Sequence, residues 1–264
     1  MNQLKPHPVH KLAPDIFTQK EKEETSSKEK AVLMVRPGFA ITMAKHKYDI
    51  YEQRIMLRII QSLPEEMKSD EDSCKIGETI GEDKILRLPT KSLLPEGNKH
   101  YDKVKTALVG LENKKIIING RDKYGKYELI VRLILKSKYY LNNQIVEIKI
   151  DKDVFRILLG LNKSYTKCMF NIAFNCSSSY TIRLYQLISH WRDEAYKRVT
   201  IEEIRDFLQL GKKYPNPYDF KKNILIPASI ELKEQGDVWF EIYESIKIGR
   251  SIIGYILKIV SKGN

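Results

Sequence analysis

The sequence predicts an α+β fold of two tandem winged-helix domains, in which helices are followed by a two-stranded β-hairpin, the wing. In the second half, an amphipathic segment at 179–192 precedes two basic helical segments and a C-terminal pair of strands. In the first half, Tyr101-Asp102 opens a basic helix that precedes a pair of strands, as Tyr218-Asp219 does later. Hydrophobic residues make up 42% of the 264 residues, which is sufficient for packed cores.

Residues 1–37 are predicted to be a flexible, disordered, charged tail. Residues 18–30 are almost wholly polar, with Lys and Glu interleaved. Such a segment cannot bury enough apolar surface to offset the entropy lost on folding. The expected domains are therefore an N-terminal winged-helix domain at 38–162 and a C-terminal winged-helix domain at 163–264.

In the N-terminal half, apolar residues recur at mixed helical spacing from Tyr48 to Leu63, and Pro64 ends the pattern. Two β-branched segments flank a turn from Gly120 to Gly125, which is typical of a hairpin. The elements expected here are a helix at 48–63, an acidic loop at 65–84, a strand at 86–89, a helix at 101–113, hairpin strands at 115–119 and 127–135, a strand at 144–150 and a short helix at 151–161.

In the C-terminal half, Ser177–Ser179 supplies an N-cap for a helix at 180–192, whose apolar side chains are expected to build the core. Thr200 and Glu203 form a capping box, and Gly211 is the expected stop of that helix. The elements that follow are a helix from Asn216-Pro217 to about Glu234, which Pro227 should kink, and strands at 237–243 and 252–260 joined by 244–251.

Composition narrows the class of partner. The chain has 46 Lys and Arg against 34 Asp and Glu, a net charge of +12, which favours a polyanionic partner, either nucleic acid or an anionic membrane surface. The three cysteines form no CxxC pair, so neither a disulfide framework nor a zinc site is expected, and no metal or cofactor is predicted. The chain lacks an apolar run long enough for a membrane span and an apolar signal core, so a cytoplasmic protein without a membrane partner is expected.

The nearest enzyme motif is Gly120-Arg-Asp-Lys-Tyr-Gly-Lys-Tyr, which matches a phosphate-binding loop until its last position. A Ser or Thr must bind Mg²⁺ there, which Tyr127 cannot do, and the segment lies between two strands. A hairpin turn is the expected structure. The five histidines form no His-apolar-His strand pair of the kind found in rolling-circle nicking enzymes. No catalytic residue is therefore predicted, and the chain is not expected to be an enzyme.

The stronger pattern surrounds the helix at 217–234. At 100° per residue, Phe220, Ile224, Leu225, Ala228 and Leu232 form a core face, and the opposite face has polar donors and an isoleucine. In a major groove, donors suit purine edges and isoleucine suits a thymine methyl; the alternative is an ordinary solvated face. The DNA contacts predicted at and before this helix are Lys212, Lys213, Tyr214, Tyr218, Lys221, Lys222, Asn223, Ile226, Ser229 and Lys233.

Other basic residues are placed around this helix. Lys247 and Arg250, in the turn of the last hairpin, are expected to contact backbone phosphates as a wing would. Arg183 is expected to face either the core loop or a phosphate. The weaker basic set of the first half, which either contacts phosphate or only makes the surface soluble, is Lys45, Lys47, Lys103, Lys105, Lys114 and Lys115.

Several segments in order resemble the iteron-binding plasmid replication initiators of the RepE and π type. The first is Tyr180-Thr-Ile-Arg-Leu-Tyr-Gln-Leu-Ile, and the helix Asp49-Ile-Tyr-Glu-Gln-Arg-Ile-Met-Leu resembles the family's first-half helix. The match continues through Thr200-Ile-Glu-Glu-Ile-Arg-Asp-Phe-Leu and Tyr218-Asp-Phe-Lys-Lys-Asn-Ile-Leu-Ile-Pro, and ends at Lys247-Ile-Gly-Arg-Ser-Ile-Ile-Gly-Tyr-Ile. Together these segments span about residues 38–260.

The resemblance implies a sequence-specific, double-stranded DNA-binding initiator. Its C-terminal domain would read the major groove of origin direct repeats, and its N-terminal domain would contact DNA and form a homodimer. Monomers would open the origin and recruit host replication proteins such as an initiator, helicase or primase, and dimers would repress the protein's own gene through an operator inverted repeat. The alternatives are a winged-helix transcription regulator, a nicking rolling-circle enzyme and a partitioning adaptor.

Overall fold

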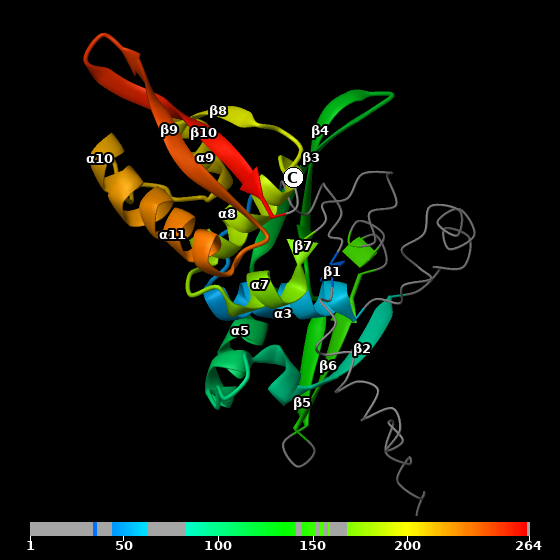
Figure 1. Ribbon diagram of the computed structural model, residues 1–264. Helices are drawn as coiled ribbons and strands as arrows, with labels where there is room; N and C mark the ends of the chain where they lie inside the picture. The colour runs from blue at the N-terminus through cyan, green and yellow to red at the C-terminus, as the bar shows by residue number, and fades with distance from the viewer. Residues whose placement is uncertain are drawn as a thin grey trace, which may run out of the picture. The chain divides into compact units, whose positions relative to one another are not determined.

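The computed structural model describes residues 34–35, 44–62, 83–140, 144–151, 154–155, 158 and 168–262, and Figure 1 shows their arrangement. None of the helices in these ranges combines the length and apolar character needed to cross a membrane. We refer to the residues up to 162 as the N-terminal half and to those from 163 as the C-terminal half. The elements of the N-terminal half are β1 (Met34–Val35), α3 (Ile50–Gln61), β2 (Lys84–Pro89), the 3-10 helix η2 (Thr90–Leu93), α5 (Tyr101–Asn113), β3 (Lys115–Asp122), β4 (Gly125–Arg132), β5 (Lys136–Tyr140) and β6 (Ile145–Ile150).

Helix α3 is the apolar centre of the N-terminal half. Asp49 caps it, since the carboxylate accepts hydrogen bonds from the backbone N–H groups of Tyr51 and Glu52. The Glu52 carboxylate accepts from the Asp49 N–H in return and also pairs with Lys114 Nζ at 2.6 Å. Helix α5 approaches so closely that a Cβ on Gly110 would lie 2.1 Å from Glu52 Oε1. A larger residue at this crossing of α3 and α5 would therefore have to displace the Glu52 carboxylate.

Among the described residues, two antiparallel sheets lie wholly within the N-terminal half. Strand β6 lies between β2 and β5, and its Val146, Ile148 and Ile150 are buried. Strands β3 and β4 form a separate hairpin that extends away from α3 (Figure 1), with only Lys123 and Tyr124 between the two strands. The predicted hairpin turn is thus confirmed.

The C-terminal half is built around a buried helix. Every residue from Thr181 to Ser189 of α8 is buried, which confirms that this helix is a scaffold for the core. Its Tyr185 hydroxyl donates to Asp237 Oδ1 at 2.5 Å and accepts from the Met169 N–H at 3.0 Å. The elements of this half are β7 (Cys168–Met169), α7 (Phe170–Asn175), α8 (Ser179–His190), β8 (Tyr196–Thr200), α9 (Ile201–Phe207), α10 (Pro217–Phe220), the π-helical η3 (Lys221–Leu225), α11 (Ile226–Gln235), β9 (Val238–Ile248) and β10 (Ser251–Ser261).

Strand β10 is the middle strand of the sheet β8-β10-β9. Its Tyr255, Leu257 and Ile259 are buried together with Phe240 of β9. A Cβ on Gly254 would lie 2.4 Å from the Val199 carbonyl oxygen, so glycine is required where β10 passes β8. Beyond this core the β9–β10 hairpin continues as a long wing beside α10 and α11 (Figure 1).

Hydrogen bonds join the two halves. Arg54 of α3 donates to the carbonyl oxygens of Phe174 and Cys176 at 2.9 and 3.0 Å. Arg183 of α8 donates to the Ala44 carbonyl oxygen at 2.8 Å, and Lys45 pairs with Asp206 of α9 at 2.8 Å. The polar contacts therefore come from helices in both halves.

Most predicted helices and strands are found, with differences at their ends. Three of the four hairpin strands are longer than expected, since β3 runs to Asp122, β9 to Ile248 and β10 to Ser261, whereas β4 ends at Arg132. The turns between the paired strands are therefore tight. Strands β5 and β8 and helix α7 were not predicted, since they are short and have polar or mixed patterns. Val154, Phe155 and Leu158 are helical and buried in the segment expected as a helix at 151–161.

Two predictions fall largely outside the described residues: the loop at 65–84, of which residues 65–82 are not described, and the tail at 1–37. Within that predicted tail, however, Met34–Val35 form strand β1, which pairs antiparallel with Cys168–Met169 of β7. Residues 34–35 of the predicted tail are therefore part of a strand pair. Pairing with a strand more than 130 residues away leaves no local pattern in the sequence.

Candidate nucleic-acid interface

The helix expected to read DNA is continuous from Pro217 to Gln235, but its middle is π-helical. Asn216 is the N-cap, with its side-chain oxygen accepting from the Asp219 N–H at 2.7 Å, and Pro217 occupies the first turn. The Ile226 N–H bonds to the Lys221 carbonyl, five residues back, immediately before Pro227. A π-helical turn is one known way to accommodate a proline that lacks an N–H. The predicted kink at Pro227 is therefore a local widening of the helix.

The core face of this helix is as predicted. Phe220, Ile224, Leu225, Ala228 and Leu232 are all buried, with relative exposures of 0 or 1%. The face turned away from that core exposes polar and apolar side chains together; its exposed residues include Tyr218, Lys222, Asn223, Ile226, Ile230, Lys233 and Glu234. Ile226 and Ile230 remain 40% and 54% exposed, which is unusual for two isoleucines one turn apart.

Two predicted contacts on this helix bond instead to the wing strand. Ser229 Oγ donates to the Phe240 carbonyl oxygen at 2.6 Å, and Lys233 Nζ pairs with Glu241 at 3.1 Å. Lys222 and Asn223 remain exposed, although the Asn223 amide donates to the Asp219 carbonyl at 2.8 Å. Lys221 is half-buried, with its Nζ 5.9 Å from the centre of the Tyr255 ring. The exposed set suited to base edges is therefore smaller than predicted.

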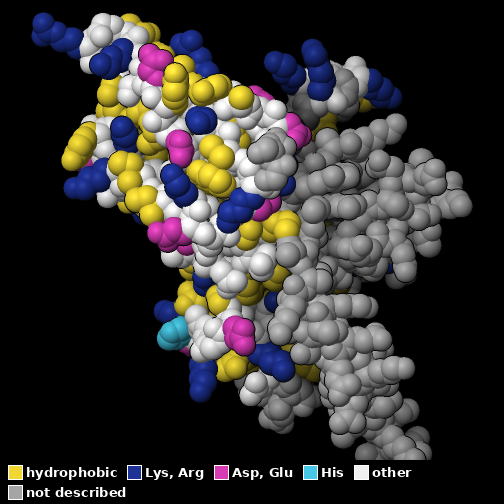
Figure 2. Space-filling view, viewed as in Figure 1, with side chains coloured by type: hydrophobic (Ala, Val, Ile, Leu, Met, Phe, Trp, Pro, Cys, Tyr) yellow, Lys and Arg dark blue, Asp and Glu magenta, His cyan; other side chains and the backbone are white. Residues whose placement is uncertain are grey.

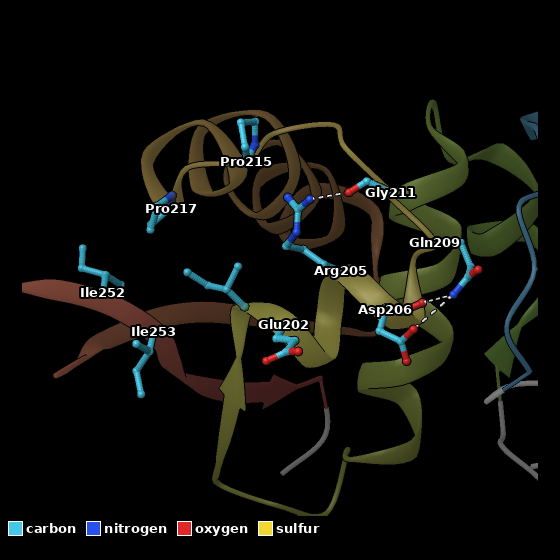
Figure 3. Close-up of a pocket in the computed structure, with 10 residues that line it drawn as sticks. Glu202, Arg205, Asp206, Gln209, Gly211, Pro215, Pro217, Ile252 and Ile253 are labelled. Carbon is cyan, nitrogen blue, oxygen red and sulfur yellow. Dashed lines mark hydrogen bonds between the residues drawn. The ribbon is translucent and has the colours of Figure 1, made fainter.

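The turn between α9 and α10 is organised by Arg205. Its guanidinium donates to the carbonyl oxygens of Gly211 at 2.6 Å, of Lys213 at 2.7 Å and of Tyr214. Figure 3 shows this side chain extending from α9 toward the turn, opposite Ile252 and Ile253 of the wing. This role could not be predicted, because an arginine within a helical pattern has the same local sequence as any solvent-exposed charge.

The same turn contains unusual backbone conformations. Gln209, Gly211 and Tyr214 have φ values of +52°, +56° and +51°. Helix α9 ends at Phe207, earlier than the predicted stop at Gly211, because Gln209 already adopts the left-handed conformation and its side chain donates to the Asp206 carbonyl (Figure 3). Lys212 and Lys213 are exposed at this turn and Tyr214 is half-buried.

The wing places the other predicted cations at its tip. Lys247 lies near the end of β9 and Arg250 lies in the turn beside Gly249, whose φ is +58°. Both side chains are exposed, and Figure 2 shows Lys and Arg gathered at the tips of both long hairpins. At the β3–β4 tip these are Arg121, Lys123 and Lys126, which were not predicted as contacts. The basic composition of this hairpin turn is the sequence feature from which these three residues could have been predicted.

Arg183 takes the first of its two expected positions. It is 3% exposed, its guanidinium carbon lies 4.0 Å from the centre of the Phe207 ring, and it donates to the Ala44 carbonyl. Burial lowers the pKa of Arg183 to about 9, because the charged guanidinium is less stable away from water. This arginine therefore joins the halves and is not accessible to a phosphate. Lys103 and Lys105, by contrast, are exposed on α5.

Two family models match the chain in sequence order. The model described as "Initiator Replication protein, WH1" matches residues 35–189, and the model described as "Initiator Rep protein, WH2" matches residues 200–259. No curated protein matches the sequence.

Among solved structures, the chain is similar to the Pi initiator protein in complex with iteron DNA, with 17% identity, a TM-score of 0.63, and coverage of 88% of this chain and 99% of that one. Domains 2 and 3 of RctB match with 11% identity, a TM-score of 0.43, and coverage of 80% and 82%. The chain therefore consists of two tandem winged-helix domains and belongs to the family of iteron-binding plasmid replication initiators.

Proposed function

We propose that this protein binds direct repeats in a plasmid origin as a sequence-specific replication initiator. The observation that supports it most is the outer face of α10–α11, where Lys222, Asn223, Ile226 and Ile230 are exposed above a fully buried core face. Donors next to two aliphatic side chains suit purine edges beside thymine methyl groups in a major groove. The Pi initiator, whose fold this chain shares, is in complex with iteron DNA.

The wider cycle of an initiator forms part of the same proposal. Monomers bind the repeats, open the origin and recruit host replication proteins in the bacterial cytoplasm. Dimers formed through the N-terminal domain, residues 38–162, repress the protein's own gene at an inverted repeat, and residues 163–264 form the reading domain. The protein acts by binding and has no enzymatic activity of its own.

Footprinting on the DNA that flanks the gene tests this function. We expect protection of direct repeats spaced by about two helical turns, with specific binding tighter than binding to a random duplex by roughly 10³-fold or more. Protection of a single inverted repeat alone would favour a transcription regulator. Incubation with supercoiled origin DNA and Mg²⁺ tests whether the protein nicks DNA, since a covalent tyrosyl–DNA product would identify a nicking enzyme instead.

The wing gives a separate prediction. Lys247→Ala and Arg250→Ala should weaken binding to all duplexes alike, because both side chains lie at an exposed tip suited to phosphates rather than bases. Each substitution should reduce the slope of log K against log salt by about 0.9, the value for one phosphate contact. Lys262→Ala, an exposed lysine after β10, serves as the matched control. A slope equal to that of the control would remove the wing from the interface.

A further inference from the structure

A cleft of about 620 Å³ lies where the two halves meet. One side is formed by the segment before α3 and by the junction of α5 and β3, and the other by the start of α8 and the turn before α10. The cleft is not at the outer face of α10–α11, because none of the exposed side chains of that face lines it. Its basic lining residues are Lys47, Lys114, Lys115, Arg183 and Lys213.

Three of these lysines have side-chain charges that are accessible to a ligand. Lys47, Lys115 and Lys213 are exposed and make no salt bridge within the residues that the structure describes. They come from three segments that are far apart in the sequence, and Lys213 belongs to the C-terminal half. Lys114, in contrast, is paired with Glu52 at 2.6 Å, and Arg183 is buried.

The remaining walls of the cleft also favour an anion. Asp49 and Ser179–Tyr180 line it at the first turns of α3 and α8, two helices of 12 residues each, so the positive ends of two helix dipoles face the same space. Among the described residues that line the cleft, Asp49 is the only carboxylate, and it already accepts hydrogen bonds from Tyr51 N and Glu52 N at 2.8 and 2.9 Å. The net charge of the cleft is therefore positive.

We propose that this cleft binds a phosphate group of the DNA backbone and connects the two halves through it. The inference rests on the proposed function, because DNA bound to α10–α11 would supply the phosphate. Lys47 and Lys115 would hold the phosphate from the N-terminal half and Lys213 from the C-terminal half, so bound DNA would fix the two halves relative to each other. A free nucleotide has the same phosphate chemistry and is the other possible source.

Salt titrations of DNA binding test the site. We expect the Lys47→Ala/Lys115→Ala double variant to reduce the slope of log K against log salt by about 0.9, one phosphate contact, on both the repeat duplex and a random duplex. The matched control is Lys91→Ala/Lys258→Ala, which removes two exposed lysines that do not line the cleft. Circular dichroism melting of every variant checks that the fold is unchanged.

Each outcome separates the inference from the proposed function. If the unaltered protein discriminates repeats but the double variant has the slope of the control, the cleft assignment is wrong and the function stands. If the unaltered protein does not discriminate repeats, the function itself fails. A rise in melting temperature with ATP or pyrophosphate in the unaltered protein, lost in the double variant, would assign the cleft to a free nucleotide and overturn the backbone assignment.

Discussion

Arg205→Ala is expected to lower the free energy of unfolding by about 2 to 4 kcal/mol and to weaken duplex binding by about tenfold or more. One guanidinium holds three carbonyl oxygens of the turn at Gly211, Lys213 and Tyr214. Hydrogen bonds from a charged donor contribute about 1.5 to 3 kcal/mol each, but this side chain is partly exposed, so water would recover part of the loss. The turn connects α9 to the N-cap of α10, the start of the helix proposed to read DNA. Loss of order in the turn should therefore weaken DNA binding as well as lower the free energy of unfolding.

Urea unfolding and fluorescence anisotropy with a labelled duplex measure the two effects of Arg205→Ala. Arg205→Lys keeps the charge but cannot reach three carbonyls at once, so we expect an intermediate loss. Arg198→Ala, an exposed arginine on β8, is the control for the loss of one positive charge. If Arg205→Ala changes neither the urea midpoint nor the affinity beyond this control, Arg205 does not organise the turn.

Asn223→Ala and Lys222→Ala are each expected to reduce the discrimination between a repeat duplex and a random duplex by about 1 to 3 kcal/mol. Both side chains are exposed on the outer face of the reading helix, so neither substitution removes core packing, and thermal stability should change little. The loss should appear on the repeat duplex, because a base contact is lost only where the correct base is present.

Competition gel shifts with both duplexes measure this discrimination, and Lys258→Ala on β10 is the control. An equal loss of affinity on the two duplexes would show that Lys222 and Asn223 contact phosphates. Replacing thymine by deoxyuridine in the repeat extends the test to Ile226 and Ile230, because it removes only the methyl group that these side chains would contact.

The helical faces could be predicted from the sequence because they depend on local periodicity. The buried face of the reading helix, the buried α8 and the capping box of Thr200 with Glu203 all follow from spacing within one or two turns. Both hairpins were predicted for the same reason, since β-branched runs with glycine between them describe local pairing. The family was indicated by something else, the resemblance of several sequence segments in order along the chain.

Contacts between distant segments were decided only by the tertiary structure. Arg183 and Arg205 both lie in helical patterns, yet one is buried against Ala44 and the other holds a turn. Ser229 and Lys233 lie on the predicted reading face but bond to β9, because the wing packs beside the helix. The cleft between the halves combines lysines from three segments. A charged residue has the same local sequence pattern whichever way its side chain points. Its bonding partner is therefore decided only by the tertiary structure.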